Sequence, residues 1–229
     1  MTVAREPVVE PRARVTRRLF IGLLLWLAVA IFALFMAVCA RYYDYFPADL
    51  FIAHRIQRID VPGFAGFMNF MNLLGDTKTY LVLVVAFAVA LGVLRAGWEA
   101  LLVLLSAAPS AVGVVMKAVV AQPRPSSALL RISVHESDSA FPSGHTLKTA
   151  ALFLVLFFVI PAVVPWRPLR WLLQAGCALI VVAAGPARVY AGAHWPSETL
   201  ESYLIVLLVI GPLLALYLAL RRPLFEPAA

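Results

Sequence analysis

Charged side chains are scarce in this sequence, and cysteine is almost absent. Only 14% of the 229 residues are charged, whereas 63% are hydrophobic and the mean hydropathy is +0.91. Because soluble domains average about 25% charged residues, a soluble globular fold, a disordered chain and a coiled coil are excluded. The two cysteines, Cys39 and Cys177, lie in apolar runs and provide no disulfide or metal-binding framework. The composition indicates a polytopic membrane protein.

Long apolar runs predict an all-α fold, a bundle of six transmembrane helices. A helix needs about 20 mostly apolar residues to cross a bilayer. The predicted spans are about Leu19–Ala40, Thr79–Leu94, Trp98–Ala121, Thr146–Val164, Leu169–Tyr190 and Thr199–Leu220. The first run could also be a signal peptide, but its length and the later spans favour an uncleaved span. We therefore expect a basic tail at residues 1–18, a six-span domain at residues 19–220 and a second tail at residues 221–229.

The segment between the first two spans has a different character. Pro47–Ile59 mixes apolar and charged residues in an amphipathic pattern, which is typical of a surface helix. Pro62–Leu74 is apolar and aromatic but too short for a crossing, so we expect an interfacial or re-entrant helix. The whole segment could form a lipid entrance, with Asp76 and Lys78 at its edge, or a simple interfacial anchor. The anchor is the preferred interpretation.

The net charge of +7 could indicate a nucleic-acid partner, but its distribution favours membrane topology. Six spans place both tails on one side. That side carries ten basic and four acidic residues, a net +6, and the other side carries nine basic and eight acidic residues, a net +1. Because cytoplasmic segments are enriched in Lys and Arg, both termini are predicted to be cytoplasmic. No nucleic-acid partner is expected.

The other side carries three short polar stretches, of which the first ends the third span. Lys117 and Arg124 are nearly two helical turns apart. Pro123 and Pro125 should end the helix between them, which places Lys117 in its last turn and Arg124 just beyond. Both bases could simply extend to the membrane interface, as bases at span ends commonly do.

The second stretch, Phe141–Thr146, directly precedes the fourth span. Ser143 and Gly144 at a helix start expose backbone N–H groups, which together with the helix dipole favour an anion. His145 in the same turn could donate a proton to a leaving group. An ordinary helix cap with a chance histidine is the alternative.

The third stretch, Arg188–Glu198, joins the last two spans. Pro196 suits the first position of a helix, with His194 at its entrance and Glu198 in its first turn. A carboxylate four residues from an imidazole fixes its tautomer and leaves the other ring nitrogen free to attack. An interfacial His-Trp pair with a capping Glu is the alternative here. Three bases, an anion-binding turn and two histidines on one side of a membrane favour hydrolysis of a phosphate-like dianion.

These stretches resemble the three-part signature of the type 2 phosphatidic acid phosphatase family, the lipid phosphate phosphatases that share their site with vanadium haloperoxidases. The matching motifs are Lys117-x6-Arg124-Pro125, Pro142-Ser143-Gly144-His145 and Arg188-x5-His194-x3-Glu198. Two positions depart from the family pattern. Ala187 precedes Arg188 where the family usually has Ser, and Glu198 replaces the usual Asp.

The resemblance implies a two-step hydrolysis through a phosphohistidine, without a metal or other cofactor. His194 would attack phosphorus, Glu198 would orient His194, and His145 would protonate the leaving oxygen and then activate water. The phosphoryl oxygens would be held by Lys117, Arg124, Arg188, Ser143 and the backbone of Gly144. A zinc site at His194 and Glu198 is disfavoured, because no third ligand has a suitable spacing.

The expected partners are the bilayer and a membrane lipid phosphate. The family's candidates are phosphatidic acid, phosphatidylglycerol phosphate, undecaprenyl pyrophosphate and lipid A phosphates, and an outward-facing site favours undecaprenyl pyrophosphate or a related lipid. The protein would then be an integral protein of a bacterial inner or plasma membrane, with its site on the outer face. A non-catalytic phosphate or lipid transporter is the rival, although transporters place their sites near the midplane. An intramembrane serine protease using Ser143 and His145 would leave the three bases and His194 without a role.

Overall fold

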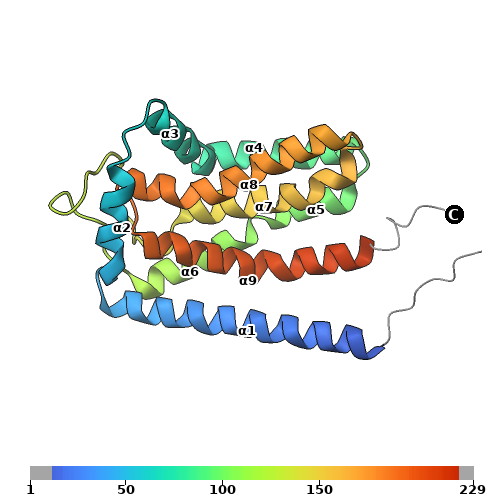
Figure 1. Cartoon of the computed structure of the whole chain (residues 1–229), viewed down its shortest axis with the longest axis horizontal. Coiled ribbons are helices and arrows are strands. Elements are labelled where there is room, and N and C mark those ends of the chain that lie inside the picture. Colours follow the sequence, from blue (N-terminus) through green and yellow to red (C-terminus); the bar gives the residue numbers. More distant parts are fainter. Residues whose placement is uncertain (1–11, 222–229) are drawn as a thin grey trace, which may run out of the picture.

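The computed structural model describes residues 12–221, and these form nine helices and no strand (Figure 1). The helices are α1 (Arg12–Tyr42), α2 (Pro47–Gln57), α3 (Phe64–Gly75), α4 (Thr77–Val93), α5 (Gly97–Leu105), α6 (Ala108–Val120), α7 (Gly144–Val163), α8 (Arg167–Tyr190) and α9 (Pro196–Arg221). Proline lies in the first turn of α2, α8 and α9, where its missing N–H costs no helical hydrogen bond. The predicted all-α fold is confirmed.

Five helical stretches of the described chain are long and apolar enough to cross a membrane. They are Leu19–Tyr42, Gly97–Val120, Gly144–Val163, Arg167–Tyr190 and Pro196–Arg221. These stretches coincide with five of the six predicted spans to within a few residues. Gly97–Val120 consists of α5 and α6, which meet at Ser106. The protein is therefore an integral membrane protein, as its composition indicated.

The remaining predicted span, Thr79–Leu94, corresponds to α4, which forms a bent pair with α3. The two helix axes meet at 69°, so α3 and α4 are one broken span or a re-entrant helix followed by a short span. The break lies at Asp76, whose backbone is extended and whose carboxylate accepts hydrogen bonds from the amides of Lys78 and Thr79. Asp76 thus caps α4 and ends α3.

The two tails fall partly within α1 and α9. Helix α1 already begins at Arg12, so residues 12–18 of the predicted N-terminal tail are helical, while residues 1–11 lie outside the described residues. Arg221 is the last residue of α9, and residues 222–229 also lie outside them. The division into two tails and one membrane domain stays a prediction.

Helix α7 forms the centre of the bundle. It packs against α3, α4, α5, α6, α8 and α9, and several of its side chains have no exposed surface: Ala150, Ala151, Leu152 and Val155. Figure 1 shows the beginning of α1 and the end of α9 at one end of the bundle. Helices α2 and α3 and the 121–143 segment lie at the opposite end, where α7 begins and α8 ends (Figure 1).

Helix α2 crosses this second end and is fixed there by a buried carboxylate. Asp49 is 2% exposed, although the sequence pattern placed it on a surface helix. Its two oxygens accept hydrogen bonds from the amide and the hydroxyl of Ser197, at 2.8 and 2.7 Å, and from the amide of Phe46 at 2.8 Å. Because Ser197 lies in the first turn of α9, Asp49 stabilises the helix start that carries Glu198.

Candidate active site

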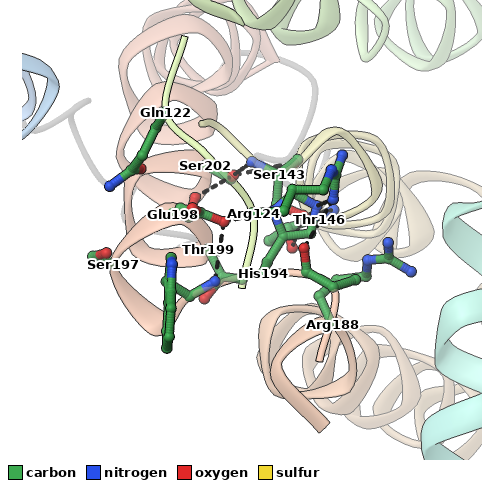
Figure 2. Close-up of polar contacts among 12 residues, drawn as sticks. Gln122, Arg124, Ser143, Thr146, Arg188, His194, Ser197, Glu198, Thr199 and Ser202 are labelled. Carbon is green, nitrogen blue, oxygen red and sulfur yellow. Dashed lines mark hydrogen bonds and ion pairs between the residues drawn. The ribbon is translucent and has the colours of Figure 1, made fainter. Parts of the chain in front are cut away.

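The three predicted motifs meet at the end of the bundle covered by α2 (Figures 1 and 2). Helix α6 ends after Lys117 because Ala121 takes a left-handed conformation and two prolines follow, at positions 123 and 125. The 121–143 segment carries Arg124, Ser143 is the N-cap of α7, and Arg188 lies in the last turn of α8. The turn between α8 and α9 carries His194. All eight predicted residues lie in this region: Lys117, Arg124, Ser143, Gly144, His145, Arg188, His194 and Glu198.

His194 is buried and has a polar partner on each ring nitrogen. Its Nδ1 lies 2.8 Å from Oε2 of Glu198, which also accepts the amide hydrogen of Trp195 at 3.0 Å. Its Nε2 lies 3.2 Å from a guanidinium nitrogen of Arg124. Because a guanidinium only donates, Nε2 is the acceptor and the ring proton lies on Nδ1, facing the carboxylate. The ring therefore presents an unprotonated Nε2 to the site.

Electrostatics also favour this neutral form. Complete burial, followed by the positive charges of Arg188 and Arg124, lowers the pKa of His194 well below its usual value of 6.5. Each of these effects disfavours the imidazolium ion. His194 is therefore a neutral imidazole at neutral pH, with a lone pair on Nε2.

A carboxylate that the sequence analysis did not single out occupies the middle of the site. Glu136 Oε1 lies 2.5 Å from a guanidinium nitrogen of Arg188 and 3.7 Å from Nδ1 of His145. Its Oε2 lies 2.7 Å from Arg124 and 3.9 Å from Nε2 of His194. Burial alone would raise the pKa of Glu136, but the charges of Arg188 and Arg124 outweigh burial and lower it. A carboxylate anion thus lies between both arginines and both histidines.

Lys117 and Arg124 share a second carboxylate, Asp138. Lys117 Nζ lies 2.7 Å from Oδ2 of Asp138 and also donates to the carbonyl of Ser139. Arg124 contacts Oδ1 of Asp138 at 2.5 Å and its carbonyl at 2.9 Å. The 121–143 segment therefore supplies carboxylates to three of the predicted phosphate-binding cations.

The start of α7 is arranged as a helix cap. Ser143 is fully buried, and its hydroxyl bonds with the hydroxyl and amide of Thr146, at 3.0 and 3.4 Å. Figure 2 shows Ser143 beside Ser202 of α9, whose hydroxyl accepts the Ser143 amide hydrogen at 3.0 Å. Gly144, by contrast, has nothing within 4 Å of the position that a Cβ would take, which leaves room beside its backbone. The Ser143 hydroxyl stabilises the helix start and does not pair with an imidazole.

Arg188 is held by a residue from helix α3. One terminal nitrogen of Arg188 donates to Oδ1 of Asn72 at 3.0 Å, and the Asn72 amide in turn donates to the carbonyl of Ala187 at 3.3 Å. The other terminal nitrogen contacts Glu136, and Nε has no hydrogen-bond partner within the described part of the chain. On the edge of the guanidinium formed by Nε and this second nitrogen, Glu136 is therefore the one hydrogen-bond partner among the described residues.

Three basic side chains gather at this site. Within residues 12–221, no three His, Cys, Asp or Glu residues are arranged to hold a metal ion. Lys117, Arg124 and Arg188 provide the positive charge, and all three donate to carboxylates in this structure.

Known proteins resemble this chain in sequence and in fold. Residues 96–222, more than half of the chain, match the PAP2 superfamily. The chain belongs to this superfamily. Phosphatidylglycerophosphatase B of Bacillus subtilis is 28% identical over 164 residues, which cover 71% of this chain and 79% of that protein. The crystal structure of the transmembrane PAP2-type phosphatidylglycerolphosphate phosphatase from Bacillus subtilis shares the fold, with a TM-score of 0.74 at 23% identity over 88% of this chain and 98% of that one.

PAP2 membership confirms the family that the three motifs predicted, and with it the enzyme class, a membrane phosphatase. All eight predicted site residues lie within the matched region. Four residues that the sequence analysis did not assign to the site also contact this machinery: Asn72, Glu136, Asp138 and, through the start of α9, Asp49. Asn72 and Asp49 precede the matched region. The only hint of Asn72 in the sequence is that it is polar within an apolar stretch.

Proposed function

We propose that this PAP2 protein hydrolyses a terminal phosphate of a membrane lipid through a phosphohistidine on His194, without a metal ion. The observation that carries this proposal is the position of the Glu136 carboxylate, which contacts Arg124 and Arg188 and lies within 4 Å of both histidines. A site that holds one anion between a nucleophile and a proton donor is suited to a phosphoryl group in the same place.

In the first step, Nε2 of His194 attacks phosphorus and a P–N bond forms. The P–O bond to the leaving group breaks, and His145 protonates the departing oxygen. Glu198 stabilises the positive charge that develops on the imidazole, since its Oε2 lies 2.8 Å from Nδ1. In the second step, water attacks phosphorus and gives a proton to His145, the P–N bond breaks, and inorganic phosphate leaves.

The phosphoryl oxygens are held by Lys117, Arg124, Arg188 and the backbone at Gly144. These groups replace the charge that a metal would supply, and their preorganised positions stabilise the transition state. The part of Ser143 in this proposal is indirect, because its hydroxyl caps α7. We assign Ser143 to positioning Gly144 and His145 at the helix start.

The proposed substrate is phosphatidylglycerol phosphate or another lipid with a terminal phosphate. The names of the two Bacillus subtilis relatives support phosphatidylglycerol phosphate over undecaprenyl pyrophosphate, which the sequence alone favoured. Phosphatidic acid is the third candidate. Both termini are proposed to be cytoplasmic, which places the site on the outer face, because the described ends of α1 and α9 lie at the end of the bundle away from it (Figure 1).

The direct test is phosphate release by the purified protein in detergent from a panel of lipid mono- and pyrophosphates. We expect release to persist in EDTA and to be inhibited by vanadate, whereas loss of activity in EDTA would refute the metal-free mechanism. His194→Ala should abolish turnover, and Ser143→Ala should only reduce it. The reverse ranking would indicate a serine hydrolase. A protein that binds these lipids but releases no phosphate would be a transporter or a binding protein.

A further inference from the structure

The Glu136 carboxylate resembles the phosphate of a phosphodiester in its charge and in its number of free oxygens. It carries one negative charge on two oxygens, and each oxygen contacts a different arginine, at 2.5 Å for Arg188 and 2.7 Å for Arg124. The phosphate of a phosphodiester also carries one negative charge on two unesterified oxygens. A terminal phosphate has three such oxygens and a charge between about −1.5 and −2 at pH 7. In both charge and oxygen count, Glu136 matches the diester.

This likeness matters for an enzyme embedded in a bilayer. Most phospholipid headgroups are phosphodiesters, and they surround the protein in large excess over any lipid with a terminal phosphate. The buried Arg188 and the partly exposed Arg124 would attract diester headgroups as well as terminal phosphates, because bidentate contacts to phosphate oxygens are strong in either case. The site therefore needs a means of excluding the diesters.

We infer that Glu136 is a specificity-determining residue, which occupies the anion site, excludes phosphodiester headgroups and yields to terminal phosphates. This inference rests on the proposed function. A diester gains no charge and no additional oxygen by replacing the carboxylate, and the carboxylate is tethered beside the site. A terminal phosphate adds charge and a third oxygen, which can bind the unpaired Nε of Arg188 or replace Asp138 at Lys117, and there is room beside the Gly144 backbone.

The segment that carries Glu136 is built so that it can leave the site. It has no helix or strand, and its ends are fixed by backbone hydrogen bonds from Ser133 to Ala191 and from Ala140 to Gln122. Between these anchors, the described backbone makes no hydrogen bond to other backbone groups, and its carbonyls at Asp138 and Ser139 accept hydrogen bonds from Arg124 and Lys117. Glu136 is held mainly through its side chain, which is 23% exposed. Its displacement by phosphate therefore breaks ion pairs that the phosphate then replaces.

The test compares wild type with Glu136→Gln, which keeps the shape of the side chain and removes its charge. Asp60→Asn is the matched control, because Asp60 is exposed near the same end of the bundle and the substitution changes the net charge equally. Phosphate release from a terminal-phosphate lipid is measured in mixed micelles with increasing phosphatidylglycerol, a diester. We expect phosphatidylglycerol to inhibit Glu136→Gln at least about tenfold more strongly than wild type, since a site freed of its occupant binds ligands more tightly. Asp60→Asn should behave as wild type.

A second measurement does not depend on turnover. Inorganic phosphate and dimethyl phosphate are compared as ligands by the shift that each causes in the thermal unfolding midpoint of the purified protein. Inorganic phosphate should stabilise both proteins, and dimethyl phosphate should stabilise Glu136→Gln but not wild type. Glu136→Asp, whose shorter carboxylate cannot reach both arginines, should give an intermediate result and serves if Glu136→Gln does not fold.

Two results would overturn the inference. One is equal stabilisation of wild type and Glu136→Gln by dimethyl phosphate. The other is a loss of kcat in Glu136→Gln with unchanged inhibition by phosphatidylglycerol, which would assign Glu136 to the chemical steps. Absence of turnover in wild type would instead refute the proposed function, and the binding comparison would still decide the role of Glu136.

Discussion

Replacement of Asn72 by alanine tests how Arg188 is held for phosphate binding. Asn72 fixes one terminal nitrogen of the Arg188 guanidinium at 3.0 Å, while Glu136 is the one hydrogen-bond partner among the described residues on the edge formed by Nε and the other terminal nitrogen. Without Asn72, the guanidinium is free to rotate away from this orientation. Ala187, the residue directly before Arg188, has no polar side chain that could replace the lost contact.

The size of the effect follows from the type of hydrogen bond. A hydrogen bond to a charged group contributes about 1.5–3 kcal/mol. Each 1.36 kcal/mol of lost transition-state binding lowers kcat/KM tenfold. Asn72→Ala should therefore lower kcat/KM by about tenfold to a hundredfold, with a matching loss of affinity for vanadate, which binds as a phosphate analogue.

The assay is steady-state phosphate release with vanadate inhibition, measured on wild type, Asn72→Ala and Asn69→Ala. Asn69 lies on the same helix, is exposed and serves as the control. Asn72→Asp is a further variant, because its carboxylate should keep Arg188 oriented and restore part of the activity. An Asn72→Ala enzyme with the vanadate affinity of the Asn69→Ala control would refute a positioning role for Asn72.

Three other substitutions or conditions test separate parts of the structure. Glu198→Gln should lower kcat by about 10⁴-fold with little change in KM, as expected when the carboxylate behind a catalytic histidine is neutralised; a change confined to KM would contradict its orienting role. Asp49→Asn should lower the free energy of unfolding by about 2–4 kcal/mol, because it leaves buried donors at Ser197 or Phe46 without an acceptor, which unfolding in mixed detergent micelles can measure. The lowered pKa of His194 predicts that the acid limb of the kcat/KM profile, corrected for substrate ionisation, lies at a pH below 6.5, where the folded protein takes up the proton on His194; an acid limb centred above pH 6.5 would show that the imidazole is not destabilised as an ion.

The residues proposed for catalysis and phosphate binding could be singled out from the sequence because their chemistry is local in the chain. His194 and Glu198 are four residues apart, Ser143 and His145 share one turn, and proline breaks mark the ends of the spans. Each of these patterns indicates a chemical role by itself, and the patterns are easy to recognise because polar residues are scarce in the rest of the sequence. The spans were predictable for a similar reason, since hydropathy depends only on residues that are adjacent in the chain.

The supporting residues were not predictable, because each acts across a long stretch of chain. Asn72 reaches Arg188 over 116 residues, Asp49 reaches Ser197 over 148, and Glu136 reaches Arg188 over 52. A carboxylate on an amphipathic segment has the same sequence pattern whether it faces water or a buried helix start. Only the docking of α2 and α3 onto α8 and α9 distinguishes the two cases.

The position of Asp49 and Asn72 has a consequence for how PAP2 domains can be exchanged between proteins. Residues 96–222 contain every side chain proposed to take part in the reaction. However, the start of α9 is held by Asp49 of α2, and the guanidinium of Arg188 is held by Asn72 of α3. A chimaera that joined residues 96–222 to the amino-terminal half of another superfamily member would keep the reacting groups and lose both supports. The amino-terminal half of this protein is therefore a structural part of the catalytic unit, and the two halves have to diverge together.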